Sequence, residues 1–266
     1  MRADDGVPAP PKPPLMLLHG VTSSAAAWAD VAPLLTGSHE LIVPTAAGHR
    51  GGPALTGRAS IAALVDVTER LLNSRGLDRV HLAGNSMGGW MAIELARRGR
   101  ALSVCALSPA GFWTPGAADA TRATATLRRM RSLSRLTRRV VSPAMKVALA
   151  RRLAMRDVAV HGENLTPHQA AEAARDMVEC AAAADLLGTQ EMVEPLTPAP
   201  CPITLAWSAR DRLFPPSING EVARRRIPDA HYVELPDVGH VPMIDDPTLC
   251  AETILAATRR ASAPAP

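Results

Sequence analysis

Ser86 stands where the chain is expected to turn sharply from a strand into a helix. The pentapeptide Gly84–Gly88 (GNSMG) lies between the apolar run 80–83 and the helix-forming stretch 90–96. Glycines two residues before and after the serine let strand and helix pass closely, and the strained turn lifts the hydroxyl above the sheet edge. The N–H of Met87 then lies at a helix N-terminus, where it can stabilise an oxyanion. This context predicts that Ser86 is a catalytic nucleophile.

A serine hydroxyl is a weak nucleophile at neutral pH and needs a base within hydrogen-bonding distance. His240 follows the expected last strand, residues 232–235, through the turn 236–239. It therefore lies on a loop at the carboxyl end of a strand, where open α/β sheets place their active sites. His19, beside Gly20, is expected to be a buried structural imidazole. His49 and His81 have no acidic or serine neighbour that would indicate a catalytic base. The histidines expected at the surface are His39, His161, His168 and His231.

The carboxylate that orients the base is expected at the end of the preceding strand. Residues 202–207 form an apolar run of strand length, and a polar loop closed by proline follows it. Asp211 lies on this loop, and the chain order Ser, Asp, His of nucleophile-elbow enzymes favours it. The competing carboxylates are Asp237, Asp245 and Asp246, of which the last two begin the approach to the final helix and suit its capping region.

Together these segments resemble the α/β-hydrolase superfamily, in its serine-nucleophile, esterase-like branch with a cap. The matching parts are the motif Leu-Leu-His-Gly at 17–20, the elbow, the acid loop around Asp211, and the pair at 239–240, so the resemblance covers most of the chain except its middle. It implies that the N–H of Val21 joins that of Met87 in an oxyanion hole. It also implies that residues 109–113 border the substrate pocket, with Phe112 and Trp113 as its candidate lining residues.

Two departures from this superfamily are visible. Many relatives carry an aspartate in the loop after the second strand, where this chain has residues 44–52 (PTAAGHRGG). Relatives usually begin with an antiparallel hairpin, whereas this chain enters its first expected strand, residues 15–18, from a proline-rich leader. The hairpin is therefore expected to be missing or reduced.

Strands and helices alternate along most of the chain, which predicts an α/β fold with a mostly parallel sheet and helices on both faces. From about residue 114 to 198 only helical patterns occur, and this stretch is expected to form a helical cap inserted after the strand that follows the elbow helix. The expected organisation is a leader (1–14), a hydrolase core in two parts (15–113 and 199–260), the cap (114–198) between them, and a tail (261–266).

Charge is segregated within the expected cap. Its first half is basic and its second half acidic, so the basic half either docks an anionic partner or pairs with the acidic helices, and we favour the pairing. The arginines in question include Arg128, Arg129, Arg131, Arg135, Arg138 and Arg139.

Composition excludes several other classes of protein. The formal net charge is only +4 and the chain has one tyrosine and two phenylalanines, which argues against nucleic-acid binding. No apolar run reaches the roughly 18 residues of a membrane span, and no signal peptide is recognisable, so a cytoplasmic protein without stable membrane insertion is expected. The four cysteines are far apart and lack metal-site spacing, so neither a metal nor another cofactor is expected.

We therefore predict a serine hydrolase that cleaves a small carboxylic ester with an apolar acyl or alkyl group through an acyl-enzyme. Epoxide hydrolases and haloalkane dehalogenases of similar fold use an aspartate where this chain has Ser86. The alternatives left open are a C–C hydrolase of the meta-cleavage-product type, an acyltransferase or cyclase, and a non-catalytic ligand receptor. C–C hydrolases usually carry a tryptophan after the catalytic histidine, where this chain has Val241.

Overall fold

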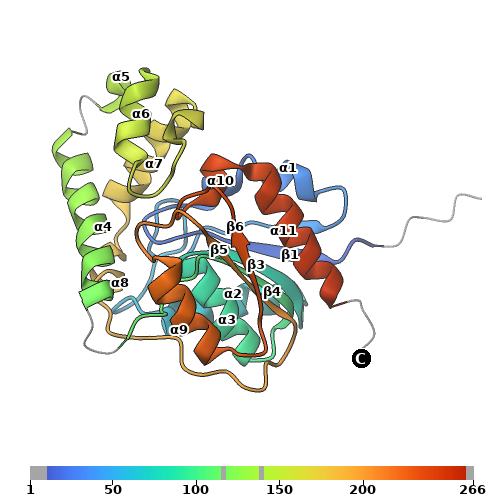
Figure 1. Ribbon diagram of the computed structural model, residues 1–266. Helices are drawn as coiled ribbons and strands as arrows, with labels where there is room; N and C mark the ends of the chain where they lie inside the picture. The colour runs from blue at the N-terminus through green and yellow to red at the C-terminus, as the bar shows by residue number, and fades with distance from the viewer. Residues whose placement is uncertain (1–10, 115–117, 138–140, 262–266) are drawn as a thin grey trace, which may run out of the picture.

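A computed structural model describes residues 11–114, 118–137 and 141–261 of the chain. Its centre is a six-stranded sheet in the order β2-β1-β3-β4-β5-β6, and every strand pairs parallel with its neighbours (Figure 1). The strands are β1 (Pro14–Leu18), β2 (Glu40–Ile42), β3 (Val80–Asn85), β4 (Ala101–Leu107), β5 (Ile203–Ser208) and β6 (His231–Leu235). Because the strands are parallel, their carboxyl ends meet at one edge of the sheet, where the candidate site residues follow them.

Helices cover both faces of the sheet, as the sequence predicted. Along β1, Leu15 and Leu17 belong to one apolar cluster, while Met16 and Leu18 belong to the other, because successive side chains of a strand point to opposite faces. The first cluster is covered by η1 (Ala25–Trp28), α1 (Ala32–Leu35) and α11 (Pro247–Arg260), and the second by α2 (Ile61–Ser74), α3 (Met87–Arg97) and α9 (Glu221–Arg226). The short η3 (Pro216–Gly220) and α10 (Pro242–Asp245) complete this part of the chain.

Only helices occur in the described residues between β4 and β5, and we call this stretch the helical segment. It consists of α4 (Ala118–Thr137), α5 (Val141–Ala144), α6 (Ala148–Met155), η2 (Gly162–Asn164), α7 (Pro167–Glu179) and α8 (Ala183–Leu186). In Figure 1 it lies beside the sheet and is drawn in green to yellow. Thr166 and Gln169 form a reciprocal capping box at the start of α7. The domain borders at 114 and 198 stay a prediction.

Several arginine side chains of the helical segment form hydrogen bonds or ion pairs with other residues of that segment. Arg128 donates to the carbonyl of Leu187, and Arg131 donates to the carbonyls of Met177 and Cys180. Arg129 pairs with an acidic residue, Asp157. Most of these bonds go to backbone carbonyls, so the pairing of these arginines with acidic side chains of the second half stays a prediction. Arg138 and Arg139 lie outside the described residues.

The N-terminal part of the described chain has no strand before β1 and two short helices after it. The stretch from Ala25 to Leu35 is divided into η1 and α1, because Pro33 lacks an N–H and is placed in the first turn of a new helix. Residues 11–13 lead directly into β1, and no antiparallel strand precedes β1 within the described residues. Residues 1–10 of the expected leader and 262–266 of the expected tail lie outside the description.

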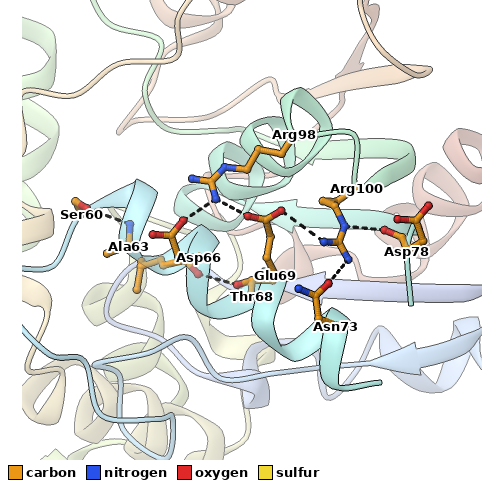
Figure 2. Close-up of polar contacts among 10 residues, drawn as sticks. Ser60, Ala63, Asp66, Thr68, Glu69, Asn73, Asp78, Arg98 and Arg100 are labelled. Atoms are coloured by element: carbon orange, nitrogen blue, oxygen red, sulfur yellow. Dashed lines mark hydrogen bonds and ion pairs between the residues drawn. The ribbon is translucent and has the colours of Figure 1, made fainter. Parts of the chain in front are cut away.

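Polar contacts hold α2 against the end of α3 (Figure 2). Arg98 pairs with Asp66 at 2.6 Å and with Glu69, while Arg100 binds Asn73 at 2.8 Å and reaches the carbonyl of Asp78. These groups are partly exposed, so each pair contributes at most about 1 kcal/mol. At the other end of α2, Ser60 accepts a hydrogen bond from the N–H of Ala63 as the N-cap. The contacts fix α2, whose first residue borders the cavity described below.

The crossing of β3 and α3 depends on glycines that leave no room for a side chain. A Cβ at Gly84 would lie 2.2 Å from the carbonyl oxygen of Gly88, and a Cβ at Gly88 would lie 2.0 Å from the carbonyl oxygen of Leu18. The close approach of α3 to the end of β1 therefore requires glycine at residue 88.

We expect Gly88→Ala to destabilise the protein, because the added methyl group must push α3 away from β1. Overpacking of this kind costs about 1–3 kcal/mol or more, which for a chain of this length lowers Tm by roughly 5–10 °C. Gly37→Ala is the matched control, since a Cβ there meets nothing within 4 Å. Thermal unfolding of both variants checks this, and equal Tm values would contradict it.

Candidate active site

Ser86 occupies the turn between β3 and α3 in a strained backbone conformation. Its φ of 55° and ψ of −117° are rare for a residue with a side chain, and such strain concentrates at functional sites. Three hydrogen bonds hold the turn: the Ser86 N–H donates to the carbonyl of Leu107 at 3.0 Å, and the Ser86 carbonyl accepts from the N–H groups of Trp90 and Ala110 at 3.1 and 3.0 Å. These three hydrogen bonds therefore keep Ser86 in its strained conformation.

His240 and Asp211 form a buried hydrogen-bonded pair. The distance from His240 Nδ1 to Asp211 Oδ2 is 2.8 Å, and the two side chains are 4% and 0% exposed. The second oxygen of Asp211, Oδ1, accepts the N–H groups of Leu213 and Phe214 at 2.9 and 2.8 Å. The carboxylate is thus held in one orientation by its own loop, directly after β5.

The bond to Asp211 determines which ring nitrogen of His240 carries the proton. A carboxylate accepts, so Nδ1 is assigned as the donor and Nε2 is left with a lone pair. The hydrogen bonds of the described residues do not include one between Nε2 and the Ser86 hydroxyl. Such bonds are often long without substrate and shorten when it binds.

Asn85 links the elbow to the histidine loop. Its side-chain Nδ2 donates to the carbonyl of His240 at 2.8 Å and to the carbonyl of Leu107 at 3.1 Å, and the residue is 1% exposed. Asn85 was not predicted to take part in the site, although its place immediately before Ser86 in the pentapeptide indicates that it lies there.

The three competing carboxylates have other partners. Asp237 pairs with Arg210 at 2.5 Å at the surface, where its side chain is 75% exposed. Asp246 caps α11 by accepting the N–H of Leu249 at 2.8 Å, as the sequence suggested. Asp245 does not cap that helix, because its oxygens accept hydrogen bonds from the N–H groups of Gly239, Val160 and His161.

Asp245 thereby joins the histidine loop to the helical segment. A further bond runs from the N–H of Val241 to the carbonyl of Val158, so both neighbours of His240 are tied to residues 158–161. A Cβ at Gly239 would lie 2.9 Å from the Cα of Ala159, so the two segments touch without a side chain between them. The bonds to Asp245 measure 2.7 Å from Gly239, 3.1 Å from Val160 and 2.6 Å from His161.

The two residues expected to form an oxyanion hole, Val21 and Met87, both line the cavity that contains Ser86. Within the part of the chain that the structure describes, neither N–H donates a hydrogen bond to a protein acceptor. Gly20 brings the Val21 loop close, since a Cβ there would lie 3.4 Å from the Cβ of Ser86. Free donors placed in this way suit the developing charge on a carbonyl oxygen.

The cavity at Ser86 is small and mostly apolar, with a volume of about 40 Å³. Three of the chain's few aromatic side chains form part of its wall, and their rings follow one another from His240: Phe214 at 5.0 Å, Trp113 at a further 6.1 Å, and Trp90 at a further 5.5 Å. The described residues that line it are Val21, Ile61, Ser86, Met87, Trp90, Ala110, Trp113, Thr124, Leu127, Leu186, Leu187, Thr189 and Phe214.

The expected pocket residues separate in the structure. Trp113 lines the cavity, but Phe112 is 1% exposed and packs against Trp207 in the core at 6.2 Å between ring centroids. Adjacent residues of an extended chain point in opposite directions, which explains why only one of the two reaches the cavity. Trp90 was missed, although it lies four residues after Ser86 and hence on the same face of α3.

The unusual loop at 44–52 is held by the helical segment rather than by an aspartate of its own. Arg50 pairs with Glu172 and Asp176 of α7. Asp176 is 3% exposed and also accepts the Ser24 hydroxyl at 2.6 Å. The segment that follows α7 reaches the same loop, since the N–H of Ala182 donates to Gly48 at 3.1 Å. A buried acidic side chain thus connects the helical segment to the loops that follow β1 and β2.

Several histidines outside the Asp211 pair are buried. His19 accepts the N–H of Ala46 at Nε2 (2.9 Å) and contacts the Gly20 carbonyl through Nδ1 (2.8 Å), and burial lowers its pKa to about 3. It is a buried imidazole, as expected. His39 was expected at the surface but is 6% exposed, because it packs edge-on against His81 at 5.5 Å. Burial lowers the pKa of His81 to about 4.

Metal ligands, cysteine thiols and membrane-spanning helices are the other features that bear on function. Among the described residues, no group of three or more His, Cys, Asp and Glu side chains could hold a metal ion. All four cysteines are free thiols, and burial raises the pKa of Cys105 to about 12 and that of Cys201 to about 11. No helix in the described part of the chain is long and apolar enough to cross a membrane. The cytoplasmic location stays a prediction.

Comparison with known proteins identifies the family. Residues 15–253 match the alpha/beta hydrolase family. The epoxide hydrolase EphH of Mycobacterium tuberculosis is 31% identical over 203 residues, which are 73% of this chain and 93% of that protein. The chain therefore belongs to the alpha/beta hydrolase family.

Other relatives act on esters. A pimeloyl-[acyl-carrier protein] methyl ester esterase of Aromatoleum aromaticum is 29% identical over 269 residues, covering 91% of this chain and 97% of that protein. The structure of a thermophilic esterase from Thermogutta terrifontis shares the fold, with a TM-score of 0.71, 23% identity, and coverage of 95% of this chain and 92% of that one. The relatives are hydrolases of different kinds, which supports hydrolase activity for this chain.

We expect protonation of His19 to lower the free energy of unfolding as the pH falls. Its pKa is about 3 when folded and about 6.5 when unfolded, so the unfolded chain binds more protons between these values. Its contribution to stability is complete above pH 6.5 and is lost toward pH 3, at up to about 1.4 kcal/mol per pH unit. Urea unfolding from pH 7.5 to 4.5 should give a shallower acid slope for His19→Gln than for the wild type. The exposed His168→Gln is the control, and equal slopes in all three proteins would refute the assignment.

Proposed function

We propose that this protein is a serine hydrolase that cleaves a small carboxylic ester through an acyl-enzyme. The observation that carries the proposal is the buried Asp211–His240 pair at 2.8 Å, on loops that also adjoin the strained turn of Ser86. The free N–H groups of Val21 and Met87 in the same cavity support it further. No metal or organic cofactor has a part in this proposal.

In the proposed reaction, Nε2 of His240 takes the hydroxyl proton while Ser86 Oγ attacks the ester carbonyl. Asp211 holds the Nδ1–H tautomer and stabilises the imidazolium that forms. The N–H groups of Val21 and Met87 donate to the oxyanion, and each such donor is worth on the order of 3 kcal/mol. His240 then protonates the leaving alcohol, and a water molecule activated by the same imidazole releases the acid.

Epoxide hydrolysis, the activity named for the Mycobacterium tuberculosis relative, fits this chain less well. The nucleophile position holds Ser86 rather than an aspartate. The one tyrosine of the chain, Tyr232, lies on β6, where it stacks on Trp207 at 6.4 Å and lies under the guanidinium of Arg224. It is therefore outside the cavity that a substrate would enter.

The remaining alternatives use the same residues. C–C bond hydrolysis and acyl transfer to an acceptor other than water would both need Ser86. Ligand binding without turnover would need only the cavity beside it. Assays with short p-nitrophenyl esters, a C–C cleavage substrate and an epoxide, run in parallel on the purified protein, distinguish them. Turnover of the ester alone supports the proposal, and turnover of the epoxide by the Ser86→Ala variant would refute it.

Removing the proposed nucleophile or misorienting the base should abolish ester turnover. We expect Ser86→Ala to leave no measurable turnover, and Asp211→Asn to reduce kcat by about 10⁴-fold, because an amide favours the wrong imidazole tautomer. Asp237→Asn is the matched control, since it changes an exposed aspartate that lies three residues before His240. Steady-state kinetics together with Tm values measure these effects. A loss of activity in the control equal to that of Asp211→Asn would transfer the acid role to Asp237.

A further inference from the structure

A second, larger hollow adjoins the cavity at Ser86. It is an open groove of about 370 Å³, compared with about 40 Å³ for the cavity. Ile61 and Trp90 line both spaces, so their side chains form a shared wall. The other lining residues of the groove are Ala62, Glu94, Arg97, Arg98, Glu191, Met192 and Glu194.

The wall is held in place from both sides. Ile61 is the first residue of α2 and is 4% exposed, and its N–H donates to Glu191 Oε2 at 3.2 Å. Glu191 also accepts the hydroxyl of Thr189 at 3.0 Å. Thr189 lines the inner cavity and Glu191 the outer groove, so the chain between them passes along the boundary. Trp90 is 3% exposed and packs edge-on against Trp113 at 5.5 Å.

The inner side of the wall suits an uncharged apolar chain, because none of the described residues that line the inner cavity is charged. The groove also contains the carboxylates of Glu94, Glu191 and Glu194. In the groove, the guanidinium groups already have partners: Arg97 binds Glu94 at 3.0 Å and two backbone carbonyls, and Arg98 binds Asp66 and Glu69. These groups therefore offer little to a charged ligand, whereas Ile61 and Trp90 offer apolar contacts to a hydrocarbon.

From this arrangement we infer that Ile61 and Trp90 are specificity-determining residues that end the pocket for the substrate's apolar chain. The inner cavity has room for about three water-sized groups, so the protein takes esters with a short, unbranched apolar chain. The inference rests on the proposed ester hydrolysis at Ser86. It adds a limit on chain length and names the residues that set it.

Ile61→Ala should extend the accepted chain into the groove. In the wild type, kcat/KM should fall by roughly tenfold or more from p-nitrophenyl butyrate to the octanoate, since a single methylene that does not fit lowers kcat/KM by about 10-fold to 200-fold. In Ile61→Ala this fall should largely disappear. Alkyl acetates from ethyl to octyl are measured as well, so that a chain on either side of the ester is covered.

Leu64→Ala is the matched control. Leu64 lies one turn later on α2, is 1% exposed, and lines neither space, so its truncation removes a similar side chain from the core. It should lower Tm comparably and keep the wild-type chain-length profile. If Ile61→Ala fails to fold, Trp90→Phe and Ile61→Val test the same wall with smaller changes.

A binding measurement separates this inference from the proposed function. Calorimetry with 1-octanol on the Ser86→Ala protein, with and without Ile61→Ala, needs no turnover. Binding of octanol only when Ile61 is truncated supports the wall, even if no ester is hydrolysed and the proposed function fails. Hydrolysis of butyrate and octanoate at equal rates by the wild type would overturn the inference while leaving ester hydrolysis intact. An unchanged profile in Ile61→Ala, with short esters still cleaved, would overturn it as well.

Discussion

The close crossing of β3 and α3 is the constraint on which the rest of the site depends. With no Cβ at Gly88, the first turn of α3 can rest on the carbonyl oxygen of Leu18 at the end of β1. The same contact brings the loop that follows β1, with the N–H of Val21, beside Ser86. A bulkier residue at 88 would push these loops apart, so this close contact helps to hold the strained turn of Ser86 beside residues 20 and 21.

Two carboxylates, the buried Asp176 and the half-buried Asp245, then connect the helical segment to the sheet. Asp176 of α7 binds Ser24 and Arg50 in the loops that follow β1 and β2. Asp245 accepts N–H groups from residue 239, beside His240, and from residues 160 and 161 of the helical segment. Because unpaired buried charges are costly, each carboxylate favours one arrangement of the chain segments around it. Placement of the helical segment and placement of the histidine loop are therefore linked through shared hydrogen bonds.

The cavity shows how few aromatic residues suffice to shape a site. The chain is only 3% aromatic, yet Phe214, Trp113 and Trp90 follow one another from His240 to the wall beside Ile61. The scarcity of aromatic residues in the composition is thus no guide to their density at the site. Large rigid rings define a cavity boundary with little conformational freedom, which suits the small volume observed.

Local sequence patterns determined the strands and helices of the sheet and the loops on which the candidate site residues lie. The glycine spacing around Ser86, the N-cap at Ser60 and the alternation of apolar strands with amphipathic helices act over a few residues, so the parallel sheet and the bounds of α2 were predictable. The hydrogen bond between Asp211 and His240 was also predictable, because Asp211 lies on the loop directly after a strand.

Only the tertiary structure decided which side chains from distant segments meet. The partners of Asp176 and Asp245 lie on segments separated by many residues, and no local pattern specifies them. Phe112 and Trp113 are equivalent by composition and position, and only the path of the chain turns one into the core and the other into the cavity. The wall of Ile61 and Trp90 is likewise formed by two helices whose relative position depends on packing between them, which the sequence of either helix alone does not contain.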